Sequence, residues 1–253
     1  MKSNYAVSDN KLLKHNKGKD GTKAGYLPLL CSLCLGLAMI PAASSQEKGD
    51  ITFRLGVVNF DPDVSSSPVQ SSTSGLLAGS SIDFSNDAQL GLNLSYMISN
   101  SFAVEAMITA PFEHDLTISG LNRYGLTTTN IGQTKQLPLA ISALYYFGQP
   151  GSRLRPYLGA GINYTKFFDD SLSTQARLEM GAEGLELDEH FGMSARAGVD
   201  WKLDNGWFVN ASVWRMNIDS NASFNSTISG PVSTYFEMDP WVYSVTVGHA
   251  FDW

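Results

Sequence analysis

The stretch WVYSVTVGHAFDW (241–253) decides the fold of this chain. Its odd-numbered positions carry mostly large apolar or aromatic side chains, and its even-numbered positions carry small or polar ones. Successive Cβ atoms of a β-strand point to opposite faces, so the pattern predicts a strand with one bulky face and one small face. In a soluble sandwich the bulky face would meet a second sheet, and in a membrane barrel it would meet lipid. One strand does not separate these two folds.

The same alternation recurs along the chain, at residues 52–58, 89–98, 102–112, 137–147, 156–168, 192–203 and 207–216. The connections between these strands alternate in length. Short turns (SNS, GQPGSR and DNG) alternate with long segments rich in Ser, Gly, Asn, Asp and Thr, at 61–81, 112–136, 169–189 and 219–235. This layout is typical of an outer-membrane barrel. The sequence therefore predicts an all-β fold, an eight-stranded antiparallel transmembrane β-barrel, with the long segments as loops outside the cell and a short helical piece within 169–189.

Charged side chains fall mainly on the small or polar faces of the predicted strands. Only 16% of the residues are charged, below the roughly 25% of soluble domains. An Arg or Lys facing lipid near the membrane midplane would cost about 2–4 kcal/mol, whereas charges of opposite sign can pair inside a small barrel. We expect four of them to form a polar plug in the lumen: Arg54, Glu105, Arg196 and Asp200.

The N-terminal segment has the pattern of an export signal. Six lysines in residues 1–26 precede the apolar run LPLLCSLCLGLAMIPAASSQ. A basic region, an apolar region and small residues in this order predict a signal peptide, residues 1–45, cleaved near 44–46. The barrel would then span 46–253. The alternative is a buried N-terminal helix or an anchoring span, although Pro28 and Pro41 disfavour a long uninterrupted helix.

The composition of the predicted mature chain excludes several functions. Both cysteines, Cys31 and Cys34, lie in the leader, so no disulfide is expected. Removing residues 1–45 removes six Lys and two Asp, which changes the net charge from −7 to −11 and disfavours nucleic acid as a partner. His114 in EHD and the acidic stretch ending at His190 lack diagnostic metal or catalytic spacing. We predict no enzyme activity, metal or cofactor.

Four stretches resemble the OmpW family of Gram-negative outer-membrane proteins: QLGLNLSYMISNSFAVEAMITAPFEH, RPYLGAGINYTKFFD, VNASVWRMNID and MDPWVYSVTVGHAF. The resemblance runs from about residue 51 to the end, and the long leader and final Asp-Trp depart from the family pattern. It implies an eight-stranded outer-membrane barrel with a narrow, partly hydrophobic interior that admits small hydrophobic molecules and releases them sideways into the membrane. Some family members are bacteriocin receptors. The aromatic C-terminus resembles the signal read by the barrel-assembly machinery.

The resemblance also points to lumen residues. In VEAMITAPF and SVWRM, Met107 and Trp214 match the family's apolar lumen-lining positions, and strand parity independently places Met107 on the lumen face. Leu144 shares the lumen parity, so Met107, Leu144 and Trp214 are the predicted ligand-binding residues. The expected function is a conduit for small hydrophobic molecules. The alternatives are a lumen closed by a hydrophobic plug, and a structural or receptor barrel whose long loops dock a bacteriocin or phage.

Overall fold

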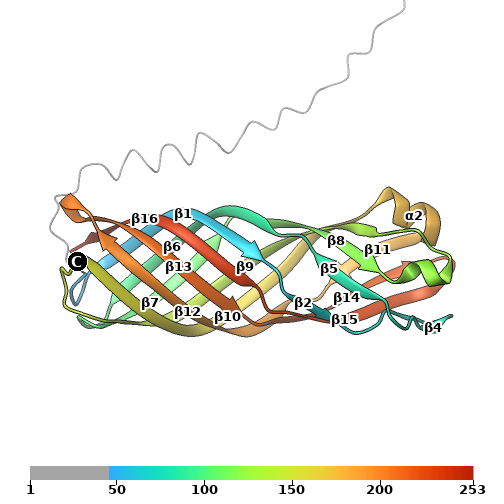
Figure 1. The fold of residues 1–253 in the computed structure, drawn as a ribbon, viewed down its shortest axis with the longest axis horizontal. Coiled ribbons are helices and arrows are strands. Elements are labelled where there is room, and N and C mark those ends of the chain that lie inside the picture. The colour runs from blue at the N-terminus through green and yellow to red at the C-terminus, as the bar shows by residue number, and fades with distance from the viewer. Residues whose placement is uncertain (1–45, 253) are drawn as a thin grey trace, which may run out of the picture. The chain divides into compact units, whose positions relative to one another are not determined.

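The computed structural model describes residues 46–252, so the predicted leader and Trp253 lie outside the described residues. The chain forms a closed antiparallel barrel of eight strands, as the sequence predicts. These strands are β1 (Ile51–Asp61), β6 (Asp87–Met97), β7 (Phe102–Thr109), β9 (Asn130–Tyr146), β10 (Leu154–Leu172), β12 (His190–Lys202), β13 (Trp207–Met216) and β16 (Trp241–Phe251) (Figure 1). The barrel closes between its first and last strands, with Ile51 opposite Phe251 and Asp61 opposite Trp241.

The predicted alternation is confirmed in every barrel strand. On β7, for example, Phe102, Val104 and Ile108 are exposed on the outside, whereas Glu105 and Met107 are buried inside. Exposed apolar side chains cover the outer wall of the other strands as well, among them Leu90, Leu92, Leu94, Ile141, Leu158, Ile162, Val245 and Val247. An apolar surface of this extent would be unfavourable in water, but it is compatible with the hydrocarbon core of a membrane.

The prediction that the long segments are loops is wrong, because most of their residues form strands. The additional strands are β2 (Val64–Ser66), β3 (Gln70–Ser71), β4 (Gly75–Leu76), β5 (Ser81–Phe84), β8 (Phe112–Ser119), β11 (Ala182–Leu187), β14 (Ile218–Ser226) and β15 (Gly230–Met238). Most of their outward residues are polar because these strands lie beyond the apolar band, which gives the segments a loop-like composition. The expected helical piece is present as α2 (Thr174–Met180), and two 3-10 turns are η1 (Leu121–Tyr124) and η2 (Asp204–Gly206).

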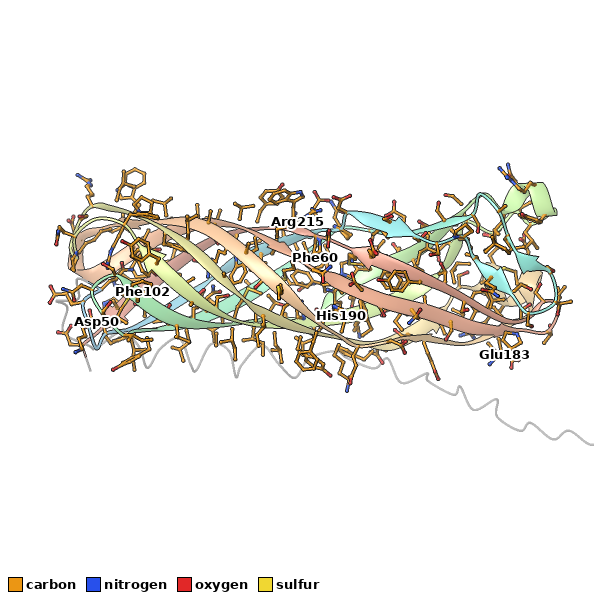
Figure 2. The ribbon with its side chains drawn as sticks, turned by 90° about the horizontal axis from the view of Figure 1, so that it is seen from below. Asp50, Phe60, Phe102, Glu183, His190 and Arg215 are labelled. Carbon is orange, nitrogen blue, oxygen red and sulfur yellow. The ribbon has the colours of Figure 1, made fainter. Side chains whose placement is uncertain are left out.

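These strands extend the barrel wall at one end, which we call the long-hairpin end; the opposite end, with the three short turns, is the short-turn end. β9 and β10 contain 17 and 19 residues, whereas a membrane crossing takes about 9–11. Phe102 and Asp50 lie at the short-turn end and Glu183 at the other, with His190 and Arg215 between them (Figure 2). Outward charged residues such as Glu113, Lys135 and Lys166 mark the limit of the apolar band. The long-hairpin end therefore extends beyond the membrane.

The interior contains two apolar clusters. The larger one runs through the long-hairpin end and includes Phe60, Phe112, Phe236, Met107 and Trp214. The smaller one consists of Met97, Ala103, Leu144, Tyr146 and Tyr157. Among the helices of residues 46–252, none is long and apolar enough to cross a membrane.

Candidate functional site

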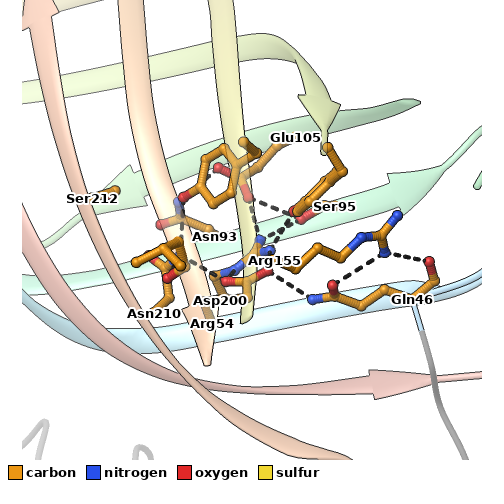
Figure 3. A network of polar contacts seen from close by, with 12 residues as sticks. Gln46, Arg54, Asn93, Ser95, Glu105, Arg155, Asp200, Asn210 and Ser212 are labelled. Atoms are coloured by element: carbon orange, nitrogen blue, oxygen red, sulfur yellow. Dashed lines mark hydrogen bonds and ion pairs between the residues drawn. The ribbon is translucent and has the colours of Figure 1, made fainter. Parts of the chain in front are cut away.

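The four charged residues predicted for the lumen form one buried network, and Figure 3 labels three of them, Arg54, Glu105 and Asp200. Arg54 donates through Nη1 to Glu105 Oε2 at 2.5 Å and through Nη2 to Asp200 Oδ2 at 2.8 Å. Arg196 forms an ion pair with the other oxygen of Glu105. The structure thus brings two positive and two negative side chains from β1, β7 and β12 together, and the quartet has no net charge.

Neutral polar groups complete this network. Arg54 also donates to Ser95 Oγ at 2.7 Å and to Tyr146 Oη at 2.6 Å. Asn93 donates to Glu105 at 2.8 Å, and Asn210 donates to Asp200 at 2.7 Å. Buried ions need such additional hydrogen bonds, because Coulomb attraction alone does not recover their lost hydration. We call the quartet and these partners the polar plug.

Arg155 is a further member of the interior that the sequence analysis did not identify. Its Nη1 donates to the carbonyl of Gln46 at 2.7 Å, and Gln46 Nε2 donates to Asp200 at 2.8 Å. Arg155 lies one residue before the predicted strand 156–168, on the same parity as Tyr157. Extending the alternation by one residue would have found it.

The three predicted ligand-binding residues are all buried, but they do not lie together. Met107 and Trp214 belong to the large apolar cluster, and the guanidinium carbon of Arg196 lies 4.2 Å from the centroid of the Trp214 ring. Leu144 belongs instead to the small cluster, with Tyr146 and Tyr157. Tyr157 and Trp214 both contact the Arg196 guanidinium, at 5.0 and 4.2 Å. The plug therefore meets the small cluster on one side and the large cluster on the other.

We call the large cluster the apolar column. Its side chains are closely packed around Ile82, Leu116 and Val232, where the cavity that they line has a volume of about 20 Å³. A second cavity, of about 10 Å³, lies beside Gln46 and Arg155 at the short-turn end. Each is large enough for about one water molecule. Any larger ligand would have to displace side chains of the column.

His114 lies in the interior, among the side chains of the apolar column, at a height beyond the apolar band of the outer surface. Its Nδ1 is 2.6 Å from the carbonyl oxygen of Ser85, and its ring is 5.3 Å from that of Phe60. Burial lowers the pKa of His114, although the Ser85 carbonyl and the Asp87 charge act in the opposite direction, so the imidazole is neutral at neutral pH. Strand alternation points Glu113 outward and His114 inward, so EHD does not form a single cluster.

At the rim of the long-hairpin end, Glu179 of α2 forms hydrogen bonds with the segment that contains Thr127 and Thr128. Its carboxylate accepts hydrogen bonds from the hydroxyl groups of Thr127 and Thr128 and, at 3.1 Å, from the backbone N–H of Thr127. These bonds lower the pKa of Glu179 to about 2. Within residues 46–252, no group of three His, Cys, Asp or Glu side chains is arranged to hold a metal ion.

Comparisons with known proteins agree with this architecture. The model of the OmpW family matches residues 47–251. Outer membrane protein W of Vibrio cholerae is 37% identical over 221 residues, covering 85% of this chain and 97% of that protein. The crystal structure of OprG from Pseudomonas aeruginosa superimposes with a TM-score of 0.76 and 31% identity, covering 82% of this chain and 98% of that one.

A more distant relative is the dibenzothiophene metabolism operon protein PahQ of Pseudomonas aeruginosa. It is 25% identical over 224 residues, covering 87% of this chain and 98% of that protein. The closed barrel, its apolar outer band and these relatives place the protein in the outer membrane of a Gram-negative cell. The chain belongs to the OmpW family.

Proposed function

We propose that this protein is a non-enzymatic conduit that lets small hydrophobic molecules enter at the long-hairpin end and leave sideways into the membrane. The observation that carries the proposal is the apolar column, which continues from Ile82 and Leu116 down to Met107 and Trp214. An apolar molecule in such a column gains about 25 cal/mol per Å² of buried apolar surface. The name of PahQ, which refers to dibenzothiophene metabolism, agrees with substrates of this class.

The polar plug makes straight passage into the periplasm unfavourable. Separating Arg54 from Glu105 and Asp200 would leave buried charges without partners, which costs about 3–5 kcal/mol when one partner is lost. An apolar molecule offers no hydrogen bond in return. A molecule that has reached Trp214 therefore needs a different exit.

The barrel wall has an interruption suited to a sideways exit. β7 pairs with β9 as far as Ile108 opposite Leu139, and β8 resumes the pairing at Phe112 opposite Gln136. Between them lies Pro111, which has no N–H to donate to a neighbouring strand. We propose that the wall opens here, beside Met107, and that the side chain of Phe112 moves with it.

The test is uptake of a labelled apolar probe by cells that carry Trp214→Asp or Trp214→Phe. Asp at this position would place a carboxylate in the column, while the adjacent Arg196 can pair with it and preserve the fold. We expect Trp214→Asp to abolish uptake and Trp214→Phe to retain it. Unchanged uptake by a correctly folded Trp214→Asp barrel would refute this form of the conduit.

A second candidate is a structural or receptor barrel with a closed lumen. It is favoured by one observation, the close packing of the column, in which the cavity lined by Ile82, Leu116 and Val232 has a volume of only about 20 Å³. In that case, neither Trp214 variant would change uptake, whereas shortening the long hairpins would abolish docking of a bacteriocin or phage. For both candidates we propose that residues 1–45 are removed on export, that β16 is recognised by the assembly machinery, and that the long-hairpin end faces outside.

A further inference from the structure

The apolar column has a polar stripe on one of its walls. His114 on β8, Gln136 on β9 and Thr165 on β10 all point inward and are fully buried. We define these three residues as the polar stripe. The wall of the column across the barrel is mainly apolar and includes Phe60, Met216, Ile218, Phe236, Met238 and Val242, although Ser220 and Thr234 also point inward at this end. The column is therefore amphipathic in cross-section.

Strand register brings the members of the stripe together. Gln136 stands opposite Phe112 of β8 and opposite Phe167 of β10. His114 and Thr165 are each two residues from those positions, so both are diagonal neighbours of Gln136. Diagonal pairs of this kind are about 7–8 Å apart between backbones, within reach of long side chains.

The hydrogen-bonding capacity of the stripe is largely unused. Gln136 Nε2, Gln136 Oε1, Thr165 Oγ1 and His114 Nε2 are buried, and none has a hydrogen bond of standard geometry within residues 46–252. The amide of Gln136 does lie within hydrogen-bonding reach of His114, where it acts to raise the pKa of the imidazole. A buried polar group without a partner costs about 1–3 kcal/mol. An amide at this position therefore costs stability, whereas Leu would fill the same space without that cost.

We propose that the polar stripe is a binding subsite for the hydroxyl group of an otherwise apolar molecule, an alcohol or a phenol, whose hydrocarbon part lies against the apolar wall. This inference rests on the conduit function and specifies its substrate class. A hydroxyl both donates and accepts, so it satisfies Gln136 Nε2 as an acceptor and Gln136 Oε1 or Thr165 Oγ1 as a donor. A hydrocarbon satisfies none of these atoms.

Charged head groups fit this subsite poorly. The carboxylate of Asp170 lies beside the stripe, where it accepts a hydrogen bond from Thr134 Oγ1 at 2.5 Å. It would repel an anionic head group. A cationic group would be left among Phe60, Phe112 and Phe167 with a neutral His114. Burying an ion there would cost more free energy than its attraction to one half-buried carboxylate would recover.

The experiment compares 1-octanol with nonane, two probes with the same number of heavy atoms that differ by one hydroxyl. Initial uptake of each radiolabelled probe is measured in whole cells with and without the protein. We expect the protein-dependent rate to be about threefold to tenfold higher for 1-octanol, the value of one or two hydrogen bonds. Gln136→Leu and Thr165→Val should each lower the ratio of the octanol rate to the nonane rate toward one.

Thr52→Val is the matched control. Thr52 is also a buried threonine whose Oγ1 has no hydrogen bond within the described residues, but it lies at the short-turn end, so both rates should stay at the wild-type values. Heat-dependent gel mobility checks that each variant is folded, and Thr165→Val serves if Gln136→Leu does not fold.

The outcomes separate the two proposals. An octanol-to-nonane ratio that is unchanged in folded Gln136→Leu and Thr165→Val barrels would overturn the hydroxyl subsite and leave the conduit standing. The same holds if wild-type cells take up both probes at equal rates. If the protein promotes uptake of neither probe, the conduit fails, and the subsite fails with it.

Discussion

Replacing Glu105 by Gln should destabilise the barrel strongly, because Glu105 is the carboxylate shared by both buried arginines. Arg54 and Arg196 each pair with one of its oxygens, and all three side chains are at most 1% exposed. Without this charge, two guanidinium groups are left with Asp200 alone. Loss of one partner of a buried ion pair costs about 3–5 kcal/mol, which is the decrease that we expect in the free energy of unfolding.

Urea unfolding of the purified barrel in lipid vesicles, followed by tryptophan fluorescence and gel mobility, measures this quantity. Adding Arg196→Met to Glu105→Gln restores charge balance, since Arg54 keeps Asp200 at 2.8 Å, and should recover at least half of the loss. The control is Glu113→Gln, because the Glu113 side chain is 69% exposed and 3.8 Å from Lys135; such a surface pair is worth about 0–1 kcal/mol. Strictly additive effects of Glu105→Gln and Arg196→Met would refute the reasoning.

Three further predictions concern the rim, assembly and orientation. Hydrogen bonds lower the pKa of Glu179 to about 2, so its contribution to the rim is complete above its ordinary pKa near 4.5 and is lost as the pH falls toward 2. The protection of the Thr127 amide, measured as its exchange rate relative to an unstructured peptide at the same pH, should decrease over that range in the wild type and should be low at every pH in Glu179→Gln. Deleting residues 251–253 removes the end of the pairing between β16 and β1, so the truncated chain should be found unfolded in the periplasm by cell fractionation, and normal insertion would contradict this. If the long-hairpin end faces outside, a membrane-impermeant thiol reagent should label Ser72→Cys but not Gln149→Cys on whole cells, and the reverse labelling would invert the proposed orientation.

Strand parity made much of this structure predictable. A period of two assigns each residue to the inside or outside without knowledge of its neighbours, which is why Arg54, Glu105, Arg196 and Asp200 were correctly assigned to the interior. The sequence pattern predicts loops where the structure has long hairpins, because the parity rule identifies a strand by an apolar, lipid-facing outer surface. Beyond the membrane, most outward residues of β14 and β15 are polar, so the amino-acid composition of these strands no longer differs from that of turns.

Height along the barrel axis was not predictable from parity. Leu144 and Met107 share the inward face, but strands in a barrel are tilted and staggered, so equal parity does not imply equal height. Only the register of β9 against β7 shows that Leu144 stands opposite Ala103, four residues below Met107 on the same strand. The shared role of Glu105 was hidden for the same reason, because it depends on which charged residues reach the same level.

The pairing of β1 with β16 has a consequence for the order in which the protein is made and folded. The residues that meet there, such as Ile51 and Phe251, are separated by nearly the whole length of the barrel sequence, and contacts of such long range form slowly. A nascent chain lacks its closing strand until β16 has been translated. Its first strand keeps an open edge during that time, and open edges of apolar strands aggregate. Delivery to the membrane must therefore keep the chain unfolded until both β1 and β16 are present.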